Sequence, residues 1–214
     1  MSEAELLLGV LKERRSVRRF KPREVPIALL SDLVEAATWA PSASNRQDWH
    51  FVMIASAAVI GELAAMVRQR WEELIASASE SGLSEEIASY AGNFDWFGKA
   101  PALFVVTCRR SDGFLEKMVG ADAAGIAGAR TSAAMATQNL MLAAHASGLG
   151  SCCLTGPLVA GKAIKKRLGI AARQEIVCLV ALGYPAEDPR APERRPVGEV
   201  ATIIIEERSP ETAT

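Results

Sequence analysis

The chain has 214 residues, of which half are hydrophobic, and its formal net charge is −1. This composition excludes extensive disorder, and the near-neutral charge argues against a broad nucleic-acid-binding surface. No apolar run approaches the about 20 residues of a membrane-spanning helix, so we expect a single cytoplasmic domain over residues 1–214 with no membrane partner.

Metal and disulfide sites are poorly supported by the cysteines. Cys108, Cys152, Cys153 and Cys178 form no C-x-x-C pair, and the chain has two histidines as further ligands. We therefore predict neither a metal site nor a disulfide framework.

The N-terminal residues predict a helix followed by a basic loop. Ser2 and Glu5 form a capping-box pattern, and Pro22 prevents the helix from continuing. Six cations lie between residues 13 and 23: Arg14, Arg15, Arg18, Arg19, Lys21 and Arg23. Guanidinium groups that meet at the end of a helix can converge on one phosphate, with Ser16 adding a hydroxyl. The alternative is a solvated basic turn.

The rest of the chain alternates helical patterns with short apolar runs. We expect helices at residues 26–40, 58–78, 122–147 and 157–168, and buried strands at 50–55, 102–108 and 175–183. Between and after them we expect a loop at 41–47, a glycine-rich turn at 148–156, an extended basic strap at 184–198 and a strand-like run at 200–205. Because the strands are apolar nearly throughout, helices should cover both faces of their sheet.

Residues 79–100 are less regular than the segments around them and carry the aromatics Tyr90, Phe94, Trp96 and Phe97. Two interpretations are open. The segment is either a lid with stacking residues over a ligand site or a small satellite of the core.

Three common motifs are absent: G-x-G-x-x-G between a strand and a helix, G-x-x-x-x-G-K-[ST], and G-x-S-x-G. Their absence argues against the usual dinucleotide, triphosphate and serine hydrolase sites. His50 and His145 are interpreted as structural. The loop at 41–47, in contrast, groups hydroxyls with two carboxamides, which can both donate to and accept from a polar ring.

Four segments together suit one ligand with a phosphate, a polyol and a polar ring. They are the basic loop at 14–18, the carboxamide loop at 41–47, the glycine turn at 150–156 and the arginine strap at 190–195. In their order and spacing they resemble the nitroreductase family of flavin enzymes. The matching stretches are Arg14-Arg15-Ser16-Val17-Arg18-Arg19-Phe20, residues 40–47, Gly148-Leu149-Gly150-Ser151, Leu182-Gly183-Tyr184-Pro185 and Arg194-Arg195-Pro196.

The resemblance implies an α+β fold, a three-layer α/β/α sandwich with a central mixed sheet flanked by helices. It also implies FMN bound at a homodimer interface and a C-terminal arm, residues 184–214, that is exchanged between the subunits. The cofactor-binding residues it implies are Arg14, Arg15, Ser16 and Arg18, with Arg194 or Arg195, for the phosphate and ribityl chain; Pro41, Ser42, Ala43 and Asn45 from the partner subunit; and Thr155 and Gly156 at the flavin ring.

By the same resemblance, NADH or NADPH reduces the flavin at N5, and a nitroaromatic, a quinone or a similar electron-poor acceptor then enters the same face. No catalytic side chain is needed, because the cofactor supplies the chemistry. The alternatives are a specialised family reaction, either reductive dehalogenation or oxygen-dependent flavin chemistry, and a non-catalytic flavin-binding module. The physiological acceptor and the choice between NADH and NADPH stay open.

The chain departs from the family pattern at a few positions. Asp48 stands where many relatives have proline, Pro192 where some have a phosphate-binding lysine, and Thr155 where some have an acidic residue. Cys153 beside the flavin turn is unusual. Its alternatives are a redox role and inert packing.

Overall fold

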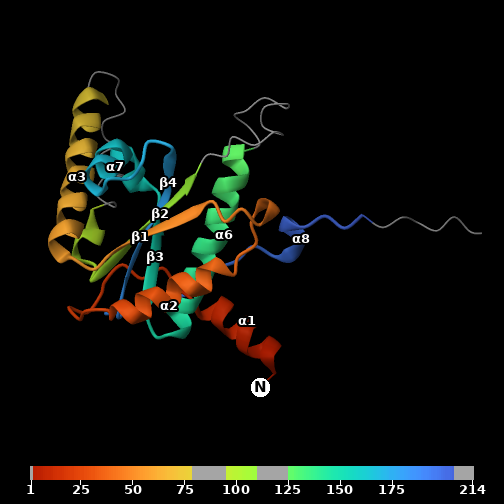
Figure 1. The fold of residues 1–214 in the computed structure, drawn as a ribbon. Coiled ribbons are helices and arrows are strands. Elements are labelled where there is room, and N and C mark those ends of the chain that lie inside the picture. Colours follow the sequence, from red (N-terminus) through yellow and green to blue (C-terminus); the bar gives the residue numbers. More distant parts are fainter. Residues whose placement is uncertain (1, 79–94, 110–124, 205–214) are drawn as a thin grey trace, which may run out of the picture.

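The computed structural model describes residues 2–78, 95–109 and 125–204. Its centre is a four-stranded antiparallel sheet in the order β1-β2-β4-β3 (Figure 1). The strands are β1 (Trp49–Ile54), β2 (Ala102–Arg109), β3 (Gly150–Leu154) and β4 (Gln174–Gly183). The three predicted strands are therefore present, and the fourth was not predicted.

Helices pack on both faces of the sheet and form three layers (Figure 1). On one face lie α2 (Ile27–Thr38) and α6 (Gly125–Ala146), and on the other α3 (Ala57–Ala78) and α7 (Gly161–Leu168). Strand β2 is buried along its whole length except at Arg109, because helices cover both of its sides. The predicted α+β sandwich is thus confirmed. Parallel pairing in the described residues is limited to an isolated bridge between Ser16 and Ser151.

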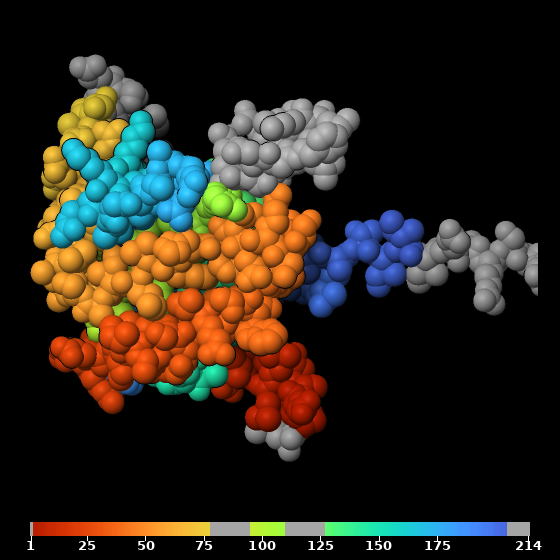
Figure 2. All heavy atoms as spheres, in the orientation of Figure 1, coloured from red at the N-terminus to blue at the C-terminus, as the bar shows by residue number. Residues whose placement is uncertain are grey.

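The N-terminal helix α1 (Glu3–Glu13) begins with the predicted capping box. The Ser2 hydroxyl accepts from the Glu5 amide, and the Glu5 carboxylate accepts from the Ser2 amide. No residue of α1 is buried, and its leucines Leu6, Leu7, Leu8 and Leu11 are exposed. Figure 2 shows that α1 and residues 197–204 both project from the body. Among the described helices, none combines the length and apolarity needed to cross a membrane.

Four short helical elements complete the described part of the chain: η1 (Ala43–Asn45), η3 (Trp96–Lys99), η4 (Gly156–Ala160) and α8 (Val197–Val200). Two predictions are corrected by the structure. The strand-like run expected at 200–205 is the last residue of α8 followed by exposed residues 201–204 outside any strand. The glycine turn expected at 148–156 is mostly strand β3. Its glycines misled the prediction, because Gly150 pairs with Gly183 inside the sheet.

The aromatic segment at 79–100 is only partly described, and Tyr90 and Phe94 lie outside the described residues. Phe97 is fully buried against Ala64 and other residues of the α3 face, and Trp96 packs beside Phe20 with ring centroids 6.3 Å apart. For these two aromatics the core interpretation is therefore correct.

Gly150 allows the basic loop to lie directly against the sheet. A Cβ atom at this position would come within 2.7 Å of the Val17 Cβ, a contact that a folded protein does not tolerate without backbone movement. Val17 is itself buried. The absence of a side chain at Gly150 therefore sets how closely residues 14–18 approach β3.

We expect Gly150→Ala to lower the free energy of unfolding by about 1–3 kcal/mol, the usual range for overpacking. Gly61→Ala in α3 is the control, because a Cβ there meets nothing within 4 Å, and it should be neutral or stabilising. Urea unfolding measures both. Unchanged stability of Gly150→Ala would contradict the close contact.

Candidate functional site

The basic loop leaves α1 at Arg14, whose amide donates to the Val10 carbonyl at 3.1 Å. The chain then runs along the outer edge of β3. The Val17 amide donates to the Ser151 carbonyl at 3.0 Å, next to the parallel bridge between Ser16 and Ser151. We call residues 14–18 the clamp. Two segments that lie far apart in the sequence are thereby fixed side by side.

Ser16 of the clamp forms a hydrogen bond with the thiol of Cys152 on β3, and the charges of Arg18 and Arg14 act on the same thiol. Burial raises the pKa of Cys152, whereas the positive charge of Arg18, the hydrogen bond with Ser16 and the charge of Arg14 act in the opposite direction. Three of the predicted phosphate ligands therefore influence the same residue of the strand. Arg15 differs, because its guanidinium donates to the carbonyls of Lys12, at 2.5 Å, and Arg14, at 2.9 Å, at the end of α1.

A cavity of about 210 Å³ lies beside the clamp, between the start of β3 and the strap. Arg14, Arg15 and Ser151 are among its lining residues. The Ser151 hydroxyl is buried and has no hydrogen-bond partner in the described part of the chain. Guanidinium donors beside a buried, unpartnered hydroxyl fit a phosphate or polyol group, so the residues present are compatible with FMN.

Glu187 in the strap holds the clamp in place. Its carboxylate accepts from the amides of Arg18, at 2.5 Å, and Arg19, at 2.9 Å, and from the Arg19 guanidinium at 2.9 Å. Partial burial acts to raise the pKa of Glu187, but the hydrogen bonds from Arg18 and Arg19 and the Arg19 charge outweigh it, so the pKa is lowered. The sequence analysis missed this residue. The adjacent acidic pair of Glu187 and Asp188, which precedes the arginines of the strap, was the available signal.

Thr155 and Gly156 follow β3 at its other end. Ser151 and Thr155 are four residues apart, so an extended strand places the turn about 13 Å from the clamp contact. The Thr155 carbonyl accepts from the Leu158 amide at 3.0 Å and begins η4. Clamp and turn therefore lie along one strand, at a spacing that suits a ligand with an anionic end and a distant ring.

Cys153 is exposed and contacts the buried Cys178 on β4. The hydrogen bond from Cys178 lowers the pKa of Cys153; it also raises the pKa of Cys178, together with burial. The Thr137 hydroxyl on α6 lies 3.8 Å from the Cys178 sulfur. All four cysteines are free thiols. Both alternatives for Cys153, a redox role and inert packing, stay hypotheses.

The carboxamide loop lies at the opposite edge of the sheet. It precedes β1, which is separated from β3 by β2 and β4, or about 14 Å at the usual strand spacing. The Ala43 amide donates to the Ser132 hydroxyl of α6 at 3.4 Å, and Ser44, Asn45 and Gln47 have positive φ angles of 54°, 52° and 50°. The structure thus does not bring Pro41, Ser42, Ala43 and Asn45 to the clamp of their own chain.

Arg194 and Arg195 are exposed, and neither lines the cavity beside the clamp. Arg194 donates to the neighbouring Glu193 carbonyl at 3.4 Å. Their phosphate contact remains a prediction. In the described ranges, no three His, Cys, Asp or Glu side chains gather as metal ligands.

We expect Glu187→Gln to lower the free energy of unfolding near neutral pH by about 0.5–1.5 kcal/mol, since Arg19 is largely exposed and screened. Because the folded-state pKa of Glu187 is lowered, this stabilisation is present above the ordinary value of 4.5 and is lost as the pH falls through the lowered pKa. The gap between variant and parent should therefore close in acid. Asp188→Asn, at a neighbouring residue that lines the same cavity, is the control. A pH-independent gap in urea unfolding would contradict this role.

Several known proteins resemble this chain. YfhC of Bacillus subtilis (strain 168), assigned by name to the NAD(P)H nitroreductases, is 26% identical, with 90% of this chain and 91% of YfhC covered. A relative from Pseudomonas putida, named 4-nitrobenzoate reductase, is 29% identical, with 90% of this chain and 91% of the relative covered. Another from Thermotoga neapolitana, named iodotyrosine deiodinase, is 26% identical, with 87% of this chain and 91% of the relative covered.

Solved structures share the fold. A BluB-like flavoprotein from Clostridium difficile 630 superposes with a TM-score of 0.82 at 27% identity, covering 93% of this chain and 99% of the other. A nitroreductase-like protein from Desulfovibrio desulfuricans, solved in complex with FMN, superposes with a TM-score of 0.67 at 25% identity, covering 95% of this chain and 98% of the other. The model of the nitroreductase family matches residues 11–184. The chain therefore belongs to the nitroreductase family of oxidoreductases.

Proposed function

We propose that this protein is an FMN-dependent oxidoreductase that takes electrons from NADH or NADPH and passes them to a nitroaromatic, a quinone or a similar electron-poor small molecule. The observation that carries the proposal is the convergence of Arg14, Ser16 and Arg18 on β3, with the turn at Thr155 and Gly156 further along the same strand. The FMN complex of a related fold and the relative named as an NAD(P)H nitroreductase support it.

The chain's own residues bind and orient the cofactor in this proposal. Arg14 and Arg18 bind the phosphate through charge-assisted hydrogen bonds, and Ser16 binds at the ribityl chain. Thr155 and Gly156 present backbone groups at the ring, where the η4 hydrogen bond to Leu158 fixes the turn. FMN itself supplies the acceptance and release of hydride at N5. No side chain has to act as a general acid or base.

The proposal requires two chains. The carboxamide loop and its own clamp lie at opposite edges of the sheet, with β2 and β4 between them, so Ser42 and Asn45 would contact the flavin of the partner subunit. The exposed apolar residues of the arm, Val197, Val200 and Ile203 among them, and the exposed leucines of α1 provide surface for a homodimer. A cytoplasmic location, where NADH and NADPH are available, fits this activity.

A second candidate is reductive dehalogenation, and the relatives named iodotyrosine deiodinase favour it. Both candidates use the same flavin site and differ in the acceptor. An iodinated phenol offered to the reduced protein would separate them through iodide release.

We expect the purified protein to carry a flavin spectrum that bleaches when NADH or NADPH is added without oxygen. An absorbance titration under anaerobic conditions measures this, and a nitroaromatic added afterwards should restore the oxidised spectrum. Bound flavin that neither nucleotide reduces would contradict the reductase. Equal affinity for FMN and riboflavin would contradict the phosphate role of the clamp.

We also expect deletion of residues 198–214 to weaken both the dimer and FMN retention, because it removes Val200, Ile203 and Ile204. Light scattering and flavin content measure the two effects. A shorter deletion that keeps Ile204 is the control. Unchanged mass and full flavin content in the longer deletion would refute the arm's role.

A further inference from the structure

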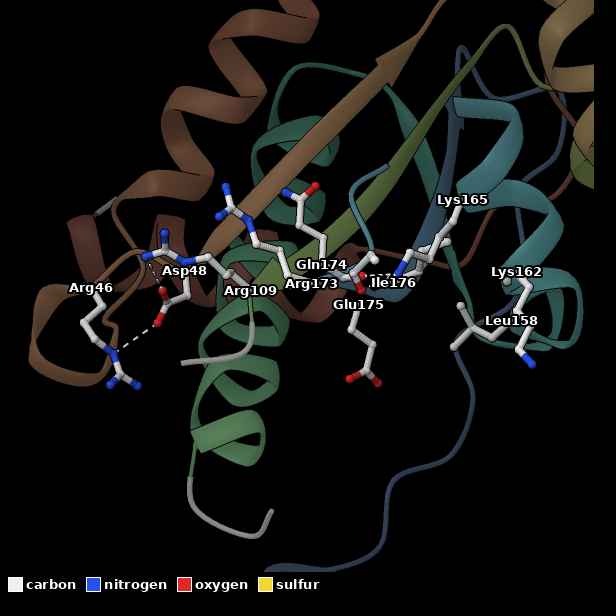
Figure 3. Close-up of a pocket in the computed structure, with 12 residues that line it drawn as sticks. Arg46, Asp48, Arg109, Leu158, Lys162, Lys165, Arg173, Gln174, Glu175 and Ile176 are labelled. Carbon is white, nitrogen blue, oxygen red and sulfur yellow. Dashed lines mark hydrogen bonds and ion pairs between the residues drawn. The ribbon is translucent and has the colours of Figure 1, made fainter. Parts of the chain in front are cut away.

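A larger cavity, of about 890 Å³, lies at the end of the sheet where β1 and β4 begin and β2 ends. Figure 3 shows side chains from the loop before β1, from the ends of β2 and β4, and from the η4–α7 region around it. None of the predicted FMN ligands lines it. The central lining residues are Arg46, Asp48, Arg109, Lys162, Lys165, Arg173 and Glu175.

This basic cavity is strongly positive for a protein of net charge −1. Five cationic and two anionic side chains line it, a local net charge of +3. The two carboxylates already have partners. Asp48 lies 3.1 Å from Arg46 and 3.5 Å from Arg109, and Glu175 bonds to Arg130, which is not a lining residue.

Part of this charge is held in place before any ligand arrives. The side chain of Asp48 is only 4% exposed, and it fixes the guanidinium groups of Arg46 and Arg109 at the rim. The Lys165 ammonium donates to the carbonyls of Ala172, at 2.9 Å, and Gln174, at 2.5 Å. Preorganised donors bind an anion with a smaller loss of side-chain entropy.

Two further cations, Lys162 and Arg173, are exposed and form no hydrogen bond or ion pair with another residue in the described portion of the chain. Leu158 and Ile176 add apolar wall. The volume lies within the range of pockets that hold small organic molecules, and it is too large for inorganic phosphate alone. An organic anion with several charges and a flat apolar body matches these features.

We propose that the basic cavity binds the adenosine diphosphate part of the nicotinamide nucleotide, an assignment that rests on the proposed function. Leu158 in its wall is two residues beyond Gly156 of the flavin turn. Leu154, the residue before Thr155, pairs with Leu179 on β4. Gln174, at the start of β4, lies about 16 Å from Leu179 along that strand. A dinucleotide can span this distance, with its nicotinamide at the turn and its phosphates among Lys162, Lys165 and Arg173.

The test uses the FMN-loaded protein, ADP as the binding probe and the double variant Lys162→Ala/Arg173→Ala. Calorimetry should show ADP binding to the parent protein and about tenfold or weaker affinity in the double variant, the scale of losing charge-assisted phosphate contacts. Lys166→Ala, an exposed cation of the same helix that does not line the cavity, should bind ADP like the parent. Circular dichroism and flavin content confirm that each variant is folded.

Kinetics separate this proposal from the proposed function. The KM for NADPH should rise about tenfold in the double variant, whereas 1-benzyl-1,4-dihydronicotinamide, which carries no phosphate, should show a far smaller change. ADP binding that is absent, or unaltered by the substitutions, overturns the cavity proposal even if NADPH bleaches the flavin. If neither NADH nor NADPH reduces the flavin while ADP binding depends on Lys162 and Arg173, the site stands as a nucleotide site and the reductase function falls. A higher KM for 4-nitrobenzoate with an unchanged KM for NADPH would overturn the assignment to the donor.

Discussion

The backbone hydrogen bond between Val17 and Ser151 joins the basic loop to the edge of the sheet, and the arrangement of the clamp depends on it. It holds the loop that carries Arg14, Ser16 and Arg18 against β3, whereas Arg15 and Arg19 bind other partners. Gly150 permits the close approach, and Glu187 neutralises part of the repulsion among the arginines. Without these three features the arginines would spread into solvent, where each would bind a phosphate weakly and independently.

The sheet decides which groups can act on one ligand. Strand β3 carries the clamp at its start and the flavin turn at its end, so both lie on one edge of the same rigid element. The carboxamide loop is attached to the opposite edge through β1 and to α6 through Ser132. A single protomer therefore holds the clamp and the carboxamide loop apart, and the proposed homodimer would place the loop of one subunit at the clamp of the other.

Local signals in the sequence predicted most of the fold. The capping box of Ser2 and Glu5, and the apolar runs that became β1, β2 and β4, depend on neighbouring residues alone, so they could be predicted. The strand at 150–154 could not, because the glycines at 148 and 150 are typical of a turn and the pairing with β4 is a tertiary contact. The prediction of a strand-like run at 200–205 was wrong for the converse reason. Its β-branched residues favour a strand, but none of the described strands pairs with residues 201–204.

The candidate site, like the fold, could be predicted where neighbouring residues carry the signal and not where distant segments meet. Arg14, Ser16 and Arg18 were recognisable as a motif, and the fold placed them together. Glu187 and the basic cavity were not predicted, because their residues come from segments that meet only after folding, and no spacing in the sequence relates Arg46 to Arg109 or Lys162 to Arg173. In the sequence, Asp48 stood out only as a departure from the family pattern. Its function as the common counter-ion of two arginines became visible once β1 and β2 were paired.

The clamp and the basic cavity lie at opposite ends of β4, with Gly183 near one and Gln174 near the other, about 30 Å apart for an extended strand. That distance is several times the Debye length of about 8 Å at physiological ionic strength. Each region therefore attracts anions through its own field, although the protein as a whole is slightly negative. Encounter of a phosphorylated ligand with either region would consequently be steered locally, and added salt should slow such association without any change in the fold.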